Sequence, residues 1–230
     1  MRFRKLLKRK FSRFTQVWIN VSDIASTLDN IQVQRGAGLS SYGSAAIGGS
    51  INLTTTNILR EKGIKLSYGA GFQEFGNQDN TQFNSSRLSI SAGSGLVDNY
   101  AVFGKFSRIN SFGYREQSYA FLNSWYFAAA RIDENFTTQI NFYGGSQDDG
   151  LAYTGLPKSF VEDKANRLKN FNYWEYENDG KTLGWPNQRR AREKEYFSQP
   201  SIELLNDWQI CPDLLFKSAL FYKIGEGYFD

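Results

Sequence analysis

The chain shows two patterns of hydrophobic and polar residues, one before and one after residue 57. The first part consists of short segments. Alternation of apolar and polar residues predicts strands at 17–21, 31–34 and 50–54. A helical turn is expected after the first strand, because Ile24, Ala25 and Leu28 recur at helical spacing, and Ser22 or Asp23 offers an oxygen to cap it. Glycines interrupt the chain between the second and third strands.

Long alternating segments fill the rest of the chain. In the segment 136–146, Phe136, Ile140 and Phe142 share one face, whereas Gln139 and Asn141 share the other. The same alternation appears in six further segments: 63–74, 82–94, 100–110, 119–132, 195–210 and 214–228. A tilted strand needs about 9–11 residues to cross a bilayer. The pattern therefore predicts about seven antiparallel strands of membrane-spanning length.

The connections between these segments alternate in length. Short turns at 97–99, 133–135 and 211–213 follow the second, fourth and sixth segments. Longer connections follow the first, third and fifth, and the longest, 147–194, has 48 residues. Outer-membrane barrels have short periplasmic turns and longer external loops. The alternation thus indicates part of a membrane barrel, with 147–194 on the outer surface.

Composition agrees with an all-β chain and argues against several kinds of enzyme. Aromatic residues make up 16% of the chain, mean hydropathy is −0.50, and no run approaches the roughly 20 apolar residues of a spanning helix. The chain has no histidine and one cysteine, Cys211. Histidine-dependent catalytic triads, cysteine zinc sites and an internal disulfide framework are therefore excluded. We expect no enzymatic activity, no cofactor and no metal site.

Basic residues are concentrated at the start of the chain. Residues 1–14 contain seven Arg or Lys and no acid, so subtracting seven from the net charge of +4 leaves −3 for the rest. Such a segment could be a nucleic-acid arm or part of a targeting signal. Its longest aliphatic run is Leu6-Leu7, and a secretory signal needs about 7–15 apolar residues. We interpret 1–16 as a disordered basic leader without a recognisable signal peptide, and expect no nucleic-acid partner.

The segment IQVQRGAGLSSYGSAAIGGSINLTT, residues 31–55, resembles the C-terminal plug motif of TonB-dependent outer-membrane receptors. The family pattern is an apolar strand, an Arg-Gly pair, a small-residue loop with Tyr-Gly, and then Gly-Gly-x-Ile-Asn. The chain matches this pattern in order and spacing at Arg35, Gly36, Tyr42, Gly43, Gly48, Gly49 and Asn52. The stretch YTGLP at 153–157 is similar, less specifically, to an early barrel segment of the ferric-complex branch.

The resemblance implies a leader at 1–16, the C-terminal part of a plug domain at 17–57 and the N-terminal part of a β-barrel at 58–230. About seven strands cannot close a barrel of about 22, so the chain is expected to be a fragment with an open wall. The implied function is energy-coupled uptake of a scarce ligand, usually a ferric siderophore, across the bacterial outer membrane. Implied partners are outer-membrane lipid, the small ligand and, for a full-length parent, the TonB complex. Arg35 is implied at the plug–barrel contact, paired with carboxylates of the barrel wall.

The long connection 147–194 is rich in aromatic side chains. The candidate ligand-binding residues there are Tyr173, Trp174, Tyr176, Trp185 and Arg189. Aromatic rings and a guanidinium could hold an iron–siderophore complex by stacking and charge. Aromatic residues also gather at barrel interfaces and inside packed loops without touching a ligand. The alternative to a receptor is a soluble all-β module that binds carbohydrate or another surface, and such a module should stay monodisperse without detergent.

Overall fold

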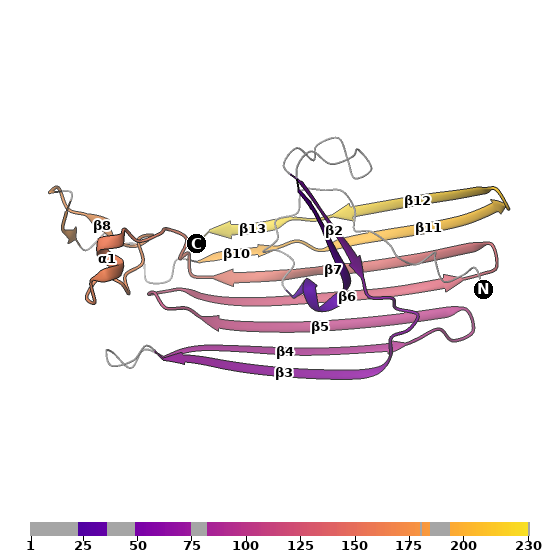
Figure 1. Ribbon diagram of the computed structural model, residues 1–230, viewed down its shortest axis with the longest axis horizontal. Coiled ribbons are helices and arrows are strands. Elements are labelled where there is room, and N and C mark those ends of the chain that lie inside the picture. The colour runs from indigo at the N-terminus through magenta and orange to yellow at the C-terminus, as the bar shows by residue number, and fades with distance from the viewer. Residues whose placement is uncertain (1–22, 36–48, 75–81, 180, 185–193, 230) are drawn as a thin grey trace.

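The computed structural model describes residues 23–35, 49–74, 82–179, 181–184 and 194–229. Its main feature is one antiparallel sheet whose long strands lie side by side in chain order (Figure 1). These strands are β3 (Lys62–Glu74), β4 (Gln82–Ser94), β5 (Tyr100–Phe112), β6 (Tyr119–Ile132), β7 (Phe136–Asp149), β11 (Ser201–Cys211) and β12 (Leu214–Lys223). The predicted all-β, antiparallel class is confirmed. The described strands form an open sheet with β3 and β12 at its edges, and not a closed barrel.

The last two predicted strands are each divided in two. Segment 195–210 forms β10 (Glu195–Ser198) and β11, whereas 214–228 forms β12 and β13 (Glu226–Phe229). The break lies at Pro200, which has no N–H to donate to a neighbouring strand. β7 continues past the break by pairing with β11 and then with β10, which also pairs with β13. Gly144 permits the close approach, because a Cβ there would lie 2.9 Å from the Cα of Pro200.

The three short turns lie together at one end of the sheet (Figure 1). In the first turn Asp98 and Asn99 both have positive φ, 44° and 70°, as a tight two-residue hairpin turn requires. The β5–β6 connection and the described part of the connection after β7, with α1 (Lys158–Glu162), β8 (Glu175–Tyr176) and β9 (Leu183–Gly184), lie at the opposite end. The predicted alternation of short and long connections is therefore also an alternation between the two ends.

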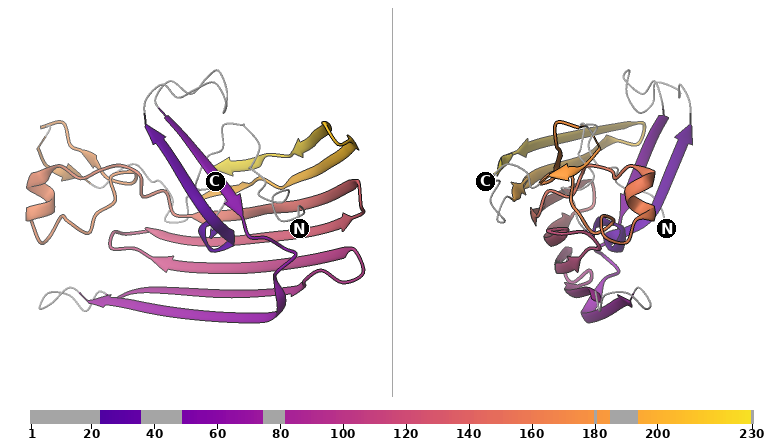
Figure 2. Two further views of the ribbon diagram at one scale, coloured as in Figure 1. Left: turned by 45° about the vertical axis from the view of Figure 1, so that its right-hand side comes forward. Right: turned by 90° about the vertical axis from the view of Figure 1, so that its left-hand side faces the viewer.

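The N-terminal segment lies across the concave face of the sheet, which we call the inner face (Figure 2). It contains the 3-10 helix η3 (Ile24–Thr27) and the hairpin of β1 (Leu28–Arg35) and β2 (Gly49–Thr55). The helix is the expected helical turn, but Leu28, which was expected to belong to it, is the first residue of β1. The two strands extend the predicted 31–34 and 50–54. The strand expected at 17–21 lies outside the described residues.

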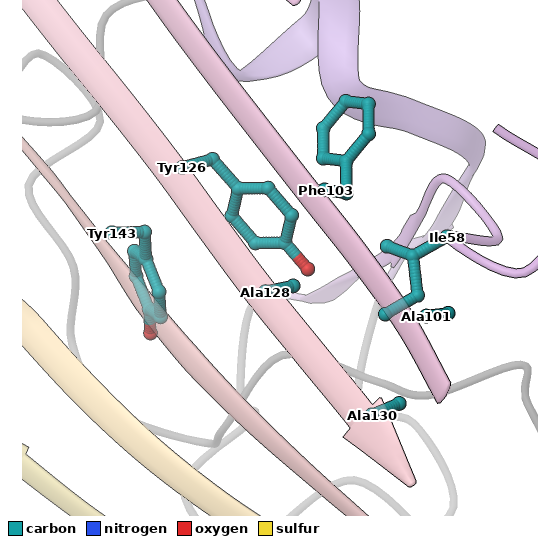
Figure 3. Close-up of a cluster of buried hydrophobic side chains, with 7 residues drawn as sticks. All are labelled: Ile58, Ala101, Phe103, Tyr126, Ala128, Ala130 and Tyr143. Carbon is teal, nitrogen blue, oxygen red and sulfur yellow. The ribbon is translucent and has the colours of Figure 1, made fainter. Parts of the chain in front are cut away.

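A small hydrophobic cluster joins this segment to the sheet (Figure 3). Ile58 comes from the link between β2 and β3, and only 2% of it is exposed. It packs with inner-face residues of β5, β6 and β7, namely Ala101, Phe103, Tyr126, Ala128, Ala130 and Tyr143. Burial of these side chains contributes to holding the N-terminal segment against the sheet.

The two faces of the sheet have the reverse of the polarity found in a soluble protein. Large apolar side chains are exposed on the convex, outer face: Ile64, Leu66, Tyr68, Phe72, Leu88, Ile90, Val102, Phe106, Phe127, Ile140, Phe142, Ile202, Leu204 and Leu220. Buried polar side chains gather on the inner face: Ser89, Lys105, Ser107, Thr137, Gln139, Asn141, Ser201, Glu203 and Asp207. Exposed apolar surface of this extent marks a face that contacts something other than water.

Candidate functional site

An ionic cluster connects the N-terminal segment to the inner face. The carboxylate of Asp23, just before η3, accepts two hydrogen bonds from Arg87 of β4, at 3.0 Å from Nε and 2.9 Å from Nη2. Lys105 of β5 lies 3.2 Å from the same carboxylate, and the hydroxyl of Ser107 donates to it. Lys105 also donates to the hydroxyl of Ser26 in η3. One carboxylate is therefore shared by two cations from neighbouring strands.

The local backbone presents Asp23 to the sheet. Its φ of 58° is left-handed, which non-glycine residues adopt rarely and Asp more readily than most. Burial by itself would raise the pKa of Asp23, but the hydrogen bonds from Arg87 and Ser107 and the charge of Lys105 outweigh burial, so the pKa lies below its usual 3.8. The carboxylate is thus held in its charged form at neutral pH.

A second polar network lies on the inner face between β6, β7 and β11. Glu203, 4% exposed, accepts a hydrogen bond from the hydroxyl of Tyr143 at 2.8 Å and from Asn141 Nδ2 at 3.3 Å. Asn141 Oδ1 in turn accepts from Gln139 Nε2 at 2.7 Å and from the hydroxyl of Tyr126 at 3.3 Å. The polar atoms of these side chains are paired by hydrogen bonds to one another, so the inner face can be polar although it is covered.

On β6, one apolar stretch of the outer face lies between a polar and a charged residue. On β6 the outer-face residues Trp125, Phe127 and Ala129 lie between Asn123 and Arg131. Eight residues at about 3.3 Å each separate the two polar positions, and a tilt of about 40° reduces this length to a height of about 20 Å. That height is close to the roughly 25 Å apolar band of outer-membrane barrels.

Of the five candidate ligand-binding residues, two have described side chains, and both contribute to the packing of their own loop. Tyr173 is buried, and its hydroxyl donates to the carbonyl of Gly150 at 3.3 Å. The indole of Trp174 donates to Glu116 at 2.8 Å, and the ammonium of Lys169 lies 3.8 Å from its ring centre. Tyr176 lies in β8. Trp185 and Arg189 fall outside the described residues. The proposed role in ligand binding stays a prediction for all five.

The residues of the glycine-rich motif are only partly described. Arg35 ends β1, pairs with Gly49 of β2 and has an exposed side chain, and Asn52 lies within β2 opposite Gln32. Gly36, Tyr42, Gly43 and Gly48 lie outside the described residues. The pairing of Arg35 with wall carboxylates stays a prediction. The contact that the structure does contain has opposite polarity, because the acid, Asp23, belongs to the segment and the cations belong to the sheet.

Sequence reasoning proposed Asp23 only as a helix cap and did not identify the ionic cluster. Arg87, Ser89, Lys105 and Ser107 share the inner face of two paired strands. Arg87 and Lys105 are both cations on this covered inner face, and a covered cation needs a nearby acid. Their presence on one face could therefore have indicated that an acid from another part of the chain lies against it. Nothing local indicated that this acid lies 64 residues before Arg87.

Comparison with known proteins gives no match: no family model, no curated protein and no solved structure matches this chain. Among the described residues, no helix combines the length and apolar character needed to cross a membrane. In that same part of the chain, His, Cys, Asp and Glu side chains do not gather in groups of three or more that could hold a metal ion.

Proposed function

We propose that the sheet is part of the wall of an outer-membrane β-barrel, and that the N-terminal segment is the C-terminal part of a plug, as in a TonB-dependent receptor. The observation that carries the proposal is the polarity of the sheet. Its exposed outer face is apolar and its covered inner face is polar and charged. A wall with lipid on one side and a hydrated interior on the other requires this arrangement.

Two further features support this reading. The strands have 10 to 14 residues, enough to cross a bilayer at a tilt. An aromatic row formed by Phe136, Trp208 and Phe216 crosses the outer face near the short turns, where such barrels carry an aromatic girdle. A soluble surface-binding module has no need of either feature.

The function that follows is energy-coupled uptake of a scarce small ligand, with ferric siderophores as the expected class. In this reading the plug blocks the barrel until force from the inner-membrane TonB complex rearranges it. The Asp23 cluster is one of the contacts that such a rearrangement must break. The receptor would perform transport and no bond-making chemistry.

Spin labels at neighbouring positions test whether the outer face meets lipid. Cys211 is first replaced by Ser, and single cysteines are placed at Phe127 on the outer face or Ala128 on the inner face. In phosphatidylcholine vesicles the label at 127 should be accessible to oxygen and protected from a water-soluble nickel complex, and the label at 128 should be protected from oxygen. Free access of the nickel complex to the label at 127, or a chain that stays monodisperse without detergent, would contradict the proposal.

A further inference from the structure

An arginine of the outer face, Arg108, has no acidic partner among the described residues. It lies on β5, two residues after Phe106, and is exposed. Across the sheet it pairs with Leu88 of β4 and with Asn123 of β6. Asn123 is the polar residue that ends the apolar stretch on β6 at the side of the β5–β6 connection. Arg108 therefore lies at the boundary of that apolar stretch.

Most of the hydrogen-bonding capacity of the Arg108 guanidinium is unused within the described part of the chain. Its Nε donates to the side chain of Asn110 at 3.1 Å, and its two Nη groups make no hydrogen bond to a described residue. Arg108 takes part in none of the ion pairs between described residues. The neighbouring outer-face positions on β4 and β6 carry no acid and are Ser86, Leu88, Ile90, Phe121, Asn123 and Trp125.

Arg131, at the other end of the apolar stretch on β6, differs from Arg108 in its partners. Its Nε lies 2.9 Å from a carboxylate oxygen of Asp133. Its guanidinium carbon lies 5.7 Å from the ring centre of Tyr100. The charge of Arg131 is thus balanced by a neighbouring residue of the chain. Of these two arginines, only Arg108 presents its charge to the surroundings of the outer face without a described counterion.

We propose that Arg108 binds the phosphate of an anionic lipid headgroup. The planar guanidinium fits phosphate oxygens well, because its Nη groups can donate parallel hydrogen bonds to them. The long side chain can place this group at headgroup level while its methylene groups stay near Leu88 and Phe106. The acyl chains of the same lipid would lie against the apolar residues nearer the short turns. The inference rests on the proposed function, since Arg108 meets headgroups only if the outer face contacts lipid.

Local quenching by brominated lipids tests the preference for an anionic headgroup. In the chain with Cys211 replaced by Ser, Leu88→Cys places a bimane fluorophore directly opposite Arg108. The chain is inserted into phosphatidylcholine vesicles that contain equal fractions of either brominated phosphatidylglycerol or brominated phosphatidylcholine. Phosphatidylglycerol should show an association constant about fivefold higher at this label, as the attraction of one cation to an anionic lipid surface would give.

Three substitutions separate this contact from a general attraction of the chain to anionic lipid. Arg108→Gln should remove the preference, whereas Arg108→Lys, which keeps the charge, should retain it. Arg131→Gln removes the same charge from the same face, but should leave the preference at residue 88 unchanged because Arg131 is paired with Asp133. The basic residues 1–14 are identical in all three variants, so their attraction to anionic lipid does not distinguish them.

Three results would overturn the inference: equal quenching by the two lipids, a preference that Arg108→Gln leaves intact, or a preference that Arg131→Gln removes equally. Circular dichroism in the same vesicles confirms that each variant is folded. The spin label at residue 127 is read in parallel vesicles. Lipid contact at residue 127 without a headgroup preference at residue 88 would contradict this inference alone. Free access of the nickel complex to residue 127 would contradict the proposed function, whatever the headgroup preference.

Discussion

The charge of Asp23 governs how the N-terminal segment meets the sheet. Arg87 and Lys105 project from neighbouring strands toward one carboxylate, and Lys105 is buried there whereas Arg87 is partly exposed. If the carboxylate is lost, both cations lose their counterion, and Lys105 keeps the desolvation cost of its buried position. Removing one partner of a buried ion pair is therefore more destabilising than the net contribution of the pair suggests.

Replacing Asp23 with Asn should weaken the attachment of the N-terminal segment by about 2–4 kcal/mol, below the full cost of a buried pair because Arg87 is partly exposed. The measurement is the rate at which protease cleaves residues 23–60 relative to the strands. Asp213→Asn, in an exposed turn, is the matched control and should have no effect. Equal protection of the Asp23 variant and the native chain would show that the cluster does not hold the segment.

The same contact should depend on pH in a defined direction. The pKa of Asp23 is lower in the folded chain than the usual 3.8, so its contribution to stability is present above 3.8 and is lost as the pH falls through the folded value. Hydrogen exchange in β1 and β2 should therefore accelerate as the pH is lowered below 3.8, after correction for intrinsic exchange. Asp23→Asn should flatten this dependence, and an unchanged profile in the variant would assign it to other carboxylates.

At the scale of secondary structure, the sequence predicted most of the sheet correctly. Strict alternation defined β3, β4 and β6 to within a residue, because a strand with one apolar and one polar face has a period of two that no helix shares. The division at Pro200 was missed, since alternation continues on both sides of it. The short turns were correct because polar residues with a tolerance for positive φ, such as Asp98 and Asn99, mark them.

The candidate site was less predictable than the strands. The Asp23 cluster depends on contacts between residues far apart in the chain, such as Asp23 with Arg87, and alternation carries no information about them. Aromatic content marked residues 173–176 as important, but could not distinguish rings that pack a loop from rings that face a ligand. The sequence therefore predicted the individual strands better than it predicted the sites formed where distant segments meet.

Gly93 of β4 should be more sensitive to substitution than Gly69 of β3. A Cβ at Gly93 would lie 2.3 Å from the carbonyl oxygen of Glu61, in the link that leads from the N-terminal segment into the sheet, whereas a Cβ at Gly69 would meet nothing within 4 Å. Gly93→Ala should cost about 1–3 kcal/mol because the link must shift, and Gly69→Ala should be close to neutral. Unfolding by denaturant measures both, and similar effects would contradict this account of the link.

At the scale of the whole molecule, the exposed apolar face separates two environments. On a soluble sheet, a charge at an exposed position such as Ile140 would change stability by less than about 0.5 kcal/mol. In a bilayer the same position lies among lipid chains, where an Arg costs about 2–4 kcal/mol near the midplane. The two environments therefore predict different results for one substitution.

Ile140→Arg should destabilise the chain in lipid vesicles by about 2–4 kcal/mol, measured by denaturant unfolding. Leu96→Arg is the matched control, because Leu96 is an equally exposed apolar residue that lies between the end of β4 and the short turn at 97–99. It should have little effect. If both variants unfold like the native chain, the outer face does not contact lipid.

The two ends of the sheet should lie on opposite sides of the membrane. The short turn at Asp98 and the long connection at Asn178 lie at opposite ends, and both residues are exposed. In a variant with Cys211 replaced by Ser, single cysteines at 98 or 178 are tested in a Gram-negative host that directs the chain to its outer membrane. An impermeant maleimide added to intact cells should label residue 178, while residue 98 should react only after the membrane is opened. Labelling at 98 alone would place the short turns outside the cell and would contradict the predicted orientation.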